Sequence, residues 1–220
     1  MPVKIPHIFL LRRLHSLTGV IPIGAFLIEH LYINFSAIES PEAFNQNIAN
    51  LRIIFPGPML PIIELFFIGL PIVFHAFLGI YISLKMKSNV SSYNYLRNWF
   101  YFCQRIAGLF LVLYIFLHVA SLRFGFWGLG KRLSVSEHAT DLINTPFSIV
   151  HTDLSQPIIL AFYILGILAA AYHLGFGLWS FAIHWGITVS EKSQRVSQWF
   201  CTTVGITVFA LGLSALLAFI

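Results

Sequence analysis

The sequence predicts an all-α fold, an integral membrane bundle of five transmembrane helices. Hydrophobic residues make up 58% of the 220 residues and charged residues 10%, with a mean hydropathy of +0.82. Water-soluble domains of this size do not reach that balance, so the bilayer must be the main solvent. Five apolar runs are long enough to cross about 30 Å of hydrocarbon, and they must be helical because lipid offers their backbone groups no partners.

The five spans are expected in one domain that covers residues 1–220. The first run follows Arg12 and Arg13 and lacks a small-residue cleavage site, so it is predicted to be a retained span rather than a signal peptide. In order, the spans are expected near residues 14–35, 60–84, 99–122, 158–187 and 199–220.

The connections between the spans differ in length. Those at residues 36–58 and 123–157 are long and rich in Pro, Asn, Gly and Ser, whereas those at 85–98 and 188–198 are short. Tryptophan favours the membrane interface, and four tryptophans lie close to predicted span ends: Trp99, Trp127, Trp185 and Trp199.

Lysine and arginine residues predict the orientation. The N-terminus and the two short connections carry Lys4, Arg12, Arg13, Lys85, Lys87, Arg97, Lys192 and Arg195. The long connections carry fewer cations together with acids: Arg52, Arg123, Lys131, Arg132, Glu39, Glu42, Glu137, Asp141 and Asp153. Because cytoplasmic segments are enriched in cations, we expect the N-terminus in the cytoplasm and the C-terminus outside.

Charge and cysteine content exclude other classes of protein. The net charge of +5 does not indicate nucleic-acid binding, because the basic residues are scattered at span ends rather than gathered in a patch. Cys103 and Cys201 form no CxxC or CxxCH motif, which argues against a thiolate metal site and covalent haem attachment. We expect two buried, inert thiols.

Four of the nine histidines lie within successive apolar spans, one on each: His30, His75, His118 and His173. A single membrane histidine often does no more than hydrogen-bond a neighbouring helix, but one histidine on each of four helices favours ligation of a cofactor. Glu29 points about 100° away from His30 and is expected to reach the interface.

Helical rise predicts two depths for these histidines. His30 and His118 fall near the outer ends of their spans, since His30 is about 25 Å beyond Arg13 and His118 is five residues before Arg123. We call these two the outer pair.

His75 and His173 form the inner pair. Lys85 follows His75 by ten residues, and His173 lies about 24 Å below Pro157, around or below mid-membrane. Because the span of His173 is long, helical rise alone leaves the depth of this histidine open.

Paired histidines at one depth can supply both axial ligands of a haem iron, which then transfers electrons and binds no substrate. The two pairs would lie about 15 Å apart along the membrane normal. Zinc or copper is the competing interpretation, but two separated pairs without cysteine or clustered carboxylates do not form a tetrahedral centre. Nearby small residues favour either a flat macrocycle or close helix packing: Gly79, Gly175 and Gly177.

The remaining histidines have weaker predicted roles. His15 and His184, at inner span ends, could bond haem propionates or simply lie at the interface. His7, His138 and His151 lie outside the spans and are expected to be solvated.

Several stretches carry a family resemblance: residues 12–17 (RRLHSL), 74–79 (FHAFLG), 104–108 (QRIAG), 173–180 (HLGFGLWS), 185–189 (WGITV) and 193–195 (SQR). They resemble the cytochrome b subunit of succinate dehydrogenase, in its single-chain, dihaem form, and the related fumarate reductases. The likeness covers nearly the whole chain, and its order of spans matches the five derived above.

The resemblance implies a site and a set of partners. It implies two b haems, one held by His75 and His173 nearer the cytoplasm and one by His30 and His118. The implied partners are a flavoprotein that oxidises succinate and an iron-sulfur subunit, in the inner (cytoplasmic) membrane. Electrons would pass from the iron-sulfur subunit through both haems to a quinone, by family analogy menaquinone. Succinate oxidation is then expected on the partner chains, with at most the quinone-reduction site on this one.

Charged residues near the spans complete the predicted site. Glu64 lies eleven residues before His75, on the same face of a regular helix and about 16 Å away, and matches a family glutamate associated with quinone chemistry. It could exchange protons with a quinone or be a structural carboxylate bonded to a neighbouring helix. Arg13 and Arg105 could pair with propionates of the inner haem or serve only as topology signals.

Two other functions fit part of this pattern. One is a dihaem cytochrome b of another respiratory dehydrogenase, such as hydrogenase or formate dehydrogenase, which its partner subunits would reveal. The other is a haem-free transporter, although interrupted helices in inverted repeats, its usual sign, are not evident in the sequence.

Overall fold

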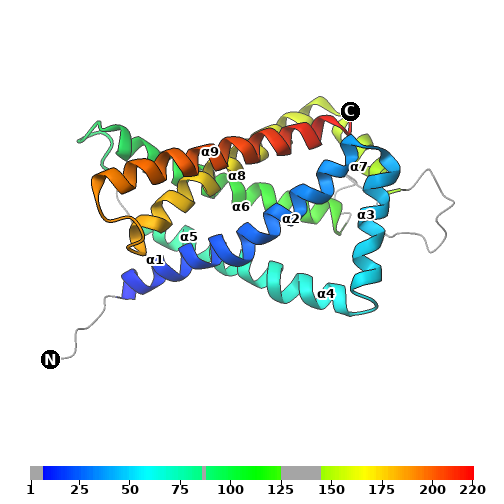
Figure 1. Cartoon of the computed structure of the whole chain (residues 1–220), viewed down its shortest axis with the longest axis horizontal. Coiled ribbons are helices and arrows are strands. Elements are labelled where there is room, and N and C mark those ends of the chain that lie inside the picture. Colours follow the sequence, from blue (N-terminus) through cyan, green and yellow to red (C-terminus); the bar gives the residue numbers. More distant parts are fainter. Residues whose placement is uncertain (1–6, 86–87, 125–144) are drawn as a thin grey trace.

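The computed structural model describes residues 7–85, 88–124 and 145–220, and within these ranges the chain is helical with no strand (Figure 1). Five helical segments of the described residues are long and apolar enough to cross a membrane: His7–Ile38, Met59–Lys85, Leu96–Leu122, Pro157–His184 and Glu191–Leu217. The predicted fold class, an all-α bundle of five transmembrane helices, is confirmed.

The first two spans are each built from several helical pieces. The first contains α1 (His7–Thr18), a π-helical turn η1 (Gly19–Ile23), α2 (Gly24–Phe35) and a 3₁₀ turn η2 (Ser36–Ile38). The second contains α4 (Met59–Ile63), a π-helical segment η3 (Glu64–Gly69) and α5 (Leu70–Lys85). The other three spans are single helices: α6 (Leu96–Leu122), α8 (Pro157–His184) and α9 (Glu191–Leu217).

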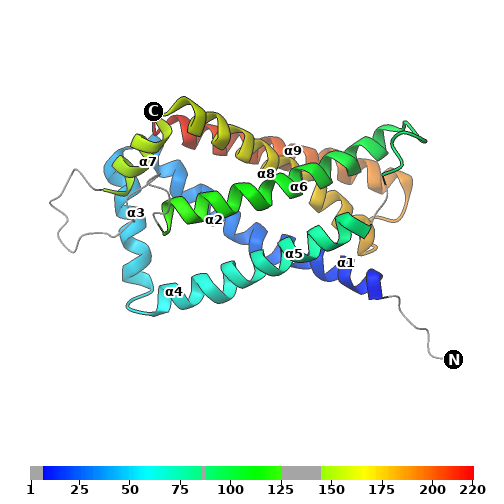
Figure 2. The same cartoon turned by 180° about the vertical axis from the view of Figure 1, so that it is seen from behind.

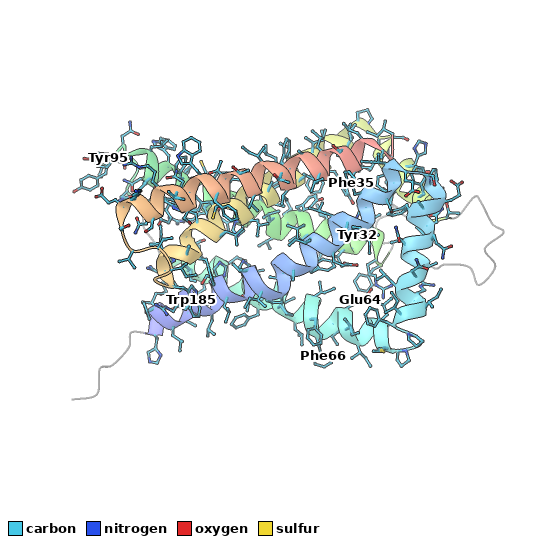
Figure 3. All side chains as sticks on the ribbon, viewed as in Figure 1. Tyr32, Phe35, Glu64, Phe66, Tyr95 and Trp185 are labelled. Atoms are coloured by element: carbon cyan, nitrogen blue, oxygen red, sulfur yellow. The ribbon has the colours of Figure 1, made fainter. Side chains whose placement is uncertain are left out.

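The spans run alternately up and down along the long axis of the bundle (Figures 1 and 2). We call the end where α1, α6 and α9 begin the N-terminal end, and the end where α2, α6 and α9 finish the C-terminal end. The start of α1 and the C-terminus of the chain lie at these opposite ends (Figure 1). Tyr95 and Trp185 mark the N-terminal end, whereas Phe35 and Glu64 lie toward the other (Figure 3).

The short connection predicted at residues 188–198 is mostly helical, so its predicted extent was wrong. The last span begins at Glu191, because the Ser190 hydroxyl caps the helix by accepting a hydrogen bond from the Ser193 N–H at 3.2 Å. The first part of α9 is polar, so a search for apolar runs did not identify it as part of a helix.

Two further helices occupy connections that composition had marked as irregular: α3 (Pro41–Ile54) and α7 (Pro146–Leu154). Ser40 and Thr145 cap them, and each has proline at its first position, where the missing N–H costs nothing. Phe44 of α3 and Leu154 of α7 join a buried apolar core at the C-terminal end, whose buried residues are Ile33, Ala37, Phe44, Leu154, Leu216 and Phe219. Helices α3 and α7 thus close this end of the bundle.

Small residues let α8 and α9 approach closely. A Cβ added at Gly175 would lie 2.9 Å from the Cys201 carbonyl oxygen, and one at Gly205 would lie 3.0 Å from that of Ala171. Gly175 therefore serves helix packing rather than contact with a macrocycle. Cys201 is buried as predicted, but Cys103 is exposed, so that half of the prediction was wrong.

Both π segments change which residues share a helix face. In η1, Pro22 has no N–H to donate to the preceding turn, which favours a local departure from α-helix. An extra residue in a turn rotates the rest of the helix by about 100° relative to the residues before it. Because η3 lies between Glu64 and His75, the shared face predicted for a regular α-helix does not hold for these two residues.

Candidate functional site

The inner pair meets near the N-terminal end of the bundle. His75 comes from α5 and His173 from α8, and their ring centroids lie 6.1 Å apart with the ring planes at 85°. Both side chains are partly buried. The structure therefore brings together the two inner histidines that the sequence paired.

The outer pair is built in the same way. His30 comes from α2 and His118 from α6, with ring centroids 5.8 Å apart and ring planes at 89°. The ring of Tyr114 stacks on His118 at 5.8 Å and 21°. Each of four spans thus contributes one imidazole to one of two pairs.

The separation of each pair fits a metal ion held between two imidazoles. A metal–imidazole bond is about 2.0–2.1 Å long, which puts the centres of two opposed rings about 6 Å apart. Glycines leave room for the rings, since a Cβ added at Gly108 would lie 2.9 Å from Cε1 of His173. In the part of the chain that the structure describes, no group of three or more His, Cys, Asp or Glu side chains could hold a metal ion. Two imidazoles at each site suit a pair of axial ligands.

The second ring nitrogen of three of these histidines has a defined partner. Nδ1 of His75 lies 2.9 Å from the His15 carbonyl oxygen, and Nδ1 of His173 lies 3.3 Å from that of Gln104. A carbonyl only accepts, so Nδ1 carries the proton and Nε2 is left free to bind a metal. For His118 the partner is the Tyr163 hydroxyl, 3.1 Å from Nδ1.

His15 belongs to the inner site, a placement that the sequence left open. Its ring stacks on that of His75 with centroids 3.8 Å apart and an interplanar angle of 18°. The RRLHSL motif and the position of His15 at a span end were the available signals, but neither indicated a contact with another histidine.

Arg13 and Arg105 lie at the N-terminal end, as predicted. The Arg13 guanidinium lies over Trp185 at 4.9 Å and donates to the His184 carbonyl oxygen at 2.9 Å. Its Nε is buried without a hydrogen-bond partner. Arg105 donates to the Ser83 carbonyl oxygen at 2.6 Å. Both are anchored on backbone oxygens close to the inner pair's end of the bundle.

Glu64 forms an ion pair with Arg123, whose Nη2 lies 2.7 Å from Oε2 of Glu64. The two side chains are 36% and 45% exposed, so the pair is open to its surroundings. The sequence treated Arg123 as a marker of the outer surface and did not predict this contact. The sequence left two roles open for Glu64. Its geometry here is that of a carboxylate bonded to a neighbouring helix.

A cavity of about 230 Å³ adjoins the outer pair between α6, α7 and α8. His118, Tyr163, Ser121 and Asp153 line it together with apolar side chains of α6 and α8. Asp153 is buried, with 9% of its surface exposed, and this burial raises the pKa of its carboxyl group to about 6. The sequence counted Asp153 merely as an acid of an outer connection, because its burial depends on the unforeseen helix α7.

Comparison with known proteins decides the family. No model of a protein family matches the chain. The succinate dehydrogenase cytochrome b558 subunit of Bacillus subtilis (strain 168) is 37% identical over 212 residues, which cover 96% of this chain and 97% of that protein. This chain belongs to the family of succinate dehydrogenase cytochrome b subunits.

As a succinate dehydrogenase cytochrome b subunit, the chain is a transmembrane partner of the other subunits of that enzyme. The match offers no support for a hydrogenase or formate dehydrogenase subunit or for a haem-free transporter.

Other predicted residues of this cytochrome b subunit lie away from the pairs. His7, His151 and His184 are exposed, and Nδ1 of His151 is 2.6 Å from the Phe219 carbonyl oxygen. Glu29 is exposed, as expected for a side chain that reaches the interface. Several residues used in the sequence analysis lie outside the described ranges: Lys4, Lys87, Trp127, Lys131, Arg132, Glu137, His138 and Asp141.

Proposed function

We propose that this subunit, a single domain over residues 1–220, carries electrons from an iron-sulfur subunit to a quinone, with two b haems held by its paired histidines. His75 and His173 would hold the inner haem, and His30 and His118 the outer one. The observation that carries the proposal is the meeting of four imidazoles from four spans in two pairs, with centroids 6.1 and 5.8 Å apart. Haem, when bound, supplies one-electron chemistry that the side chains lack.

The chain's own groups orient the ligands. The carbonyl oxygens of His15 and Gln104 hold the Nδ1 protons of the inner pair, which leaves both Nε2 atoms unprotonated and able to bind a metal. A haem iron held by two of these histidines would have no position left for a substrate, so the proposed role of this subunit is electron transfer without succinate binding. The flavoprotein subunit is then the place of succinate oxidation.

The N-terminal end is proposed to face the cytoplasm, with the chain in the inner (cytoplasmic) membrane. Cations concentrate at this end in Arg12, Arg13, Lys85, Arg97, Lys192 and Arg195, as the positive-inside rule requires. The flavoprotein and iron-sulfur subunits would dock here. Arg13 and Arg105 are proposed to pair with the propionates of the inner haem, a role supported by the unpartnered Nε of Arg13.

The quinone is proposed to react near the outer pair, and menaquinone is the proposed type by family analogy. Glu64 is the proposed proton-exchanging group, because it is an acid within a span and begins a π segment, a feature often found at functional sites. Its carboxylate is paired with the Arg123 guanidinium, so proton uptake by Glu64 would accompany loosening of the ion pair.

A reduced-minus-oxidised optical spectrum of the purified complex, with haem quantitation, tests the proposal. We expect two b haems per chain, both low-spin and insensitive to carbon monoxide, because both axial positions are filled by histidine. One haem per chain, or a high-spin iron that binds carbon monoxide, would contradict the pairing. Copurification of a flavoprotein and an iron-sulfur protein checks the proposed partners.

A further inference from the structure

His15 and His75 form a reciprocal contact between α1 and α5. Their rings stack at 3.8 Å with an angle of 18°. Nδ1 of His75 lies 2.9 Å from the carbonyl oxygen of His15, and Nδ1 of His15 lies 3.1 Å from the carbonyl oxygen of His75. Each imidazole is therefore aligned by the backbone of the other helix.

A glycine one helical turn after each histidine makes this contact possible. Gly19 follows His15 by four residues, and Gly79 follows His75 by four. A Cβ added at Gly19 would lie 2.6 Å from Cε1 of His75, and one at Gly79 would lie 2.8 Å from Cε1 of His15. The same His-x-x-x-Gly arrangement thus occurs on both helices, and each glycine accommodates the opposite ring.

The two neighbours of His75 use different parts of its ring. His15 covers a face of the ring at a small angle, whereas His173 meets it nearly at right angles, at 85°. His15 is therefore a stacking partner of the His75 ring, whereas His173 is the second histidine of the inner pair. Thr18 adds a hydroxyl 3.3 Å from Nδ1 of His75.

We propose that His15 is a positioning residue that sets the ring plane of His75 at the inner site. The inference rests on the proposed function of His75 as an axial ligand. The carbonyl oxygen of residue 15 persists in any substitution, so the Nδ1 proton of His75 keeps its acceptor. The His15 side chain adds the stacking surface and the hydrogen bond to the His75 carbonyl, and these hold the ring plane and the backbone of α5.

The test uses the assembled membrane complex with the substitution His15→Ala. We expect both haems to be retained, with a shift of the inner haem's electron paramagnetic resonance g values and of its midpoint potential. The g values report the orientation of the axial imidazole planes. If His15 served packing alone, its loss would leave this orientation, and therefore the g values, unchanged. The outer haem should keep both quantities. His15→Gln retains a donor that can reach the His75 carbonyl and should restore part of the shift.

Gly79→Ala tests the same contact without removing a histidine, because the added methyl group pushes the His15 ring off its position. We expect it to shift the inner haem in the manner of His15→Ala. Gly69→Ala, in the same span as Gly79 but away from the inner pair, is the matched control, since its Cβ would make an ordinary 3.5 Å contact with the Glu64 carbonyl oxygen. It should leave the inner haem unchanged.

Unchanged inner-haem g values and potential in both His15→Ala and Gly79→Ala overturn the inference. If His15→Ala loses the inner haem altogether, the inference is tested by Gly79→Ala and His15→Gln instead. Inner-haem g values and midpoint potential equal to those of the wild type in both variants would then overturn it. Loss of that haem in His15→Ala but not in His75→Ala would make His15 the ligand, which also overturns it. Failure of the proposed function is distinguishable, because the unsubstituted complex would then lack two six-coordinate haems.

Discussion

The Tyr163 hydroxyl lies 3.1 Å from Nδ1 of His118, whereas the two inner histidines have backbone carbonyl oxygens as Nδ1 partners. A phenol is a weaker acceptor than a carbonyl and can be removed by substitution, which a backbone group cannot. The two haem sites proposed for this cytochrome b subunit would therefore differ in the electron density of their axial ligands.

We expect Tyr163→Phe to retain both haems and to raise the midpoint potential of the outer haem alone. Loss of the acceptor makes the His118 imidazole a poorer donor, so the oxidised iron is less stabilised. Potentiometric titration of the haems measures the shift. Tyr172→Phe on the same helix is the matched control, because the Tyr172 hydroxyl donates to the Phe100 carbonyl oxygen and not to a histidine. Equal shifts in the two variants would contradict the prediction.

Single substitutions of the four paired histidines should give two different phenotypes, one for the inner pair and one for the outer pair. His75→Ala or His173→Ala is expected to remove the inner haem and weaken docking of the soluble subunits, and His30→Ala or His118→Ala to remove the outer haem and block transfer to quinone. Each substitution leaves one iron with half its protein ligands. Haem titration, together with membrane-bound succinate dehydrogenase activity measured with an artificial acceptor, checks this. If His75→Ala and His118→Ala lost the same haem, the assignment of pairs would be wrong.

Glu64→Gln is expected to keep both haems and slow quinone reduction, because the amide keeps the size of the side chain but cannot exchange a proton. Steady-state quinone reduction across pH is the measurement. Glu29→Gln, which removes an exposed carboxylate of the first span, serves as the control. Unchanged quinone turnover of Glu64→Gln at every pH would reject the proton-transfer role.

Asp153 predicts a pH dependence of stability. Its pKa is raised from the ordinary value of 3.8 to about 6 by burial, so the folded state binds this proton more tightly than the unfolded state does. The contribution of Asp153 to the free energy of unfolding is therefore most favourable below about pH 4 and is lost as the pH rises to about 6. Asparagine does not ionise, so Asp153→Asn should not lose stability in this way. Its gain in stability over the unsubstituted protein should be larger at pH 8 than at pH 5.

Thermal unfolding of the detergent-solubilised complex at these two pH values checks the Asp153 prediction. Glu42→Gln, at an exposed position of α3, is the control and should change the midpoint little at either pH. An equal gain for Asp153→Asn at pH 5 and pH 8 would show that the carboxyl group does not titrate in this range.

The sequence by itself determined the number of spans, the presence of one histidine on each of four of them, and the family. These are local properties, because a bilayer requires each crossing segment to be apolar and helical over a set length. Helical rise then converts a position in the chain into a depth, which paired His30 with His118, whereas the pairing of His173 with His75 also needed the family resemblance. Family motifs such as HLGFGLWS are likewise contained in short stretches.

The tertiary structure alone decided which side chains of different spans meet. The stacking of His15 on His75, the ion pair of Glu64 with Arg123 and the burial of Asp153 each depend on how helices rotate about their axes and pack. Rotation is not readable from hydropathy, because lipid accepts apolar side chains on every face of a span and the π segments η1 and η3 shift the helical register. Helices α3 and α7 depend on polar caps and on a core assembled from distant segments, so a search for apolar runs could not find them.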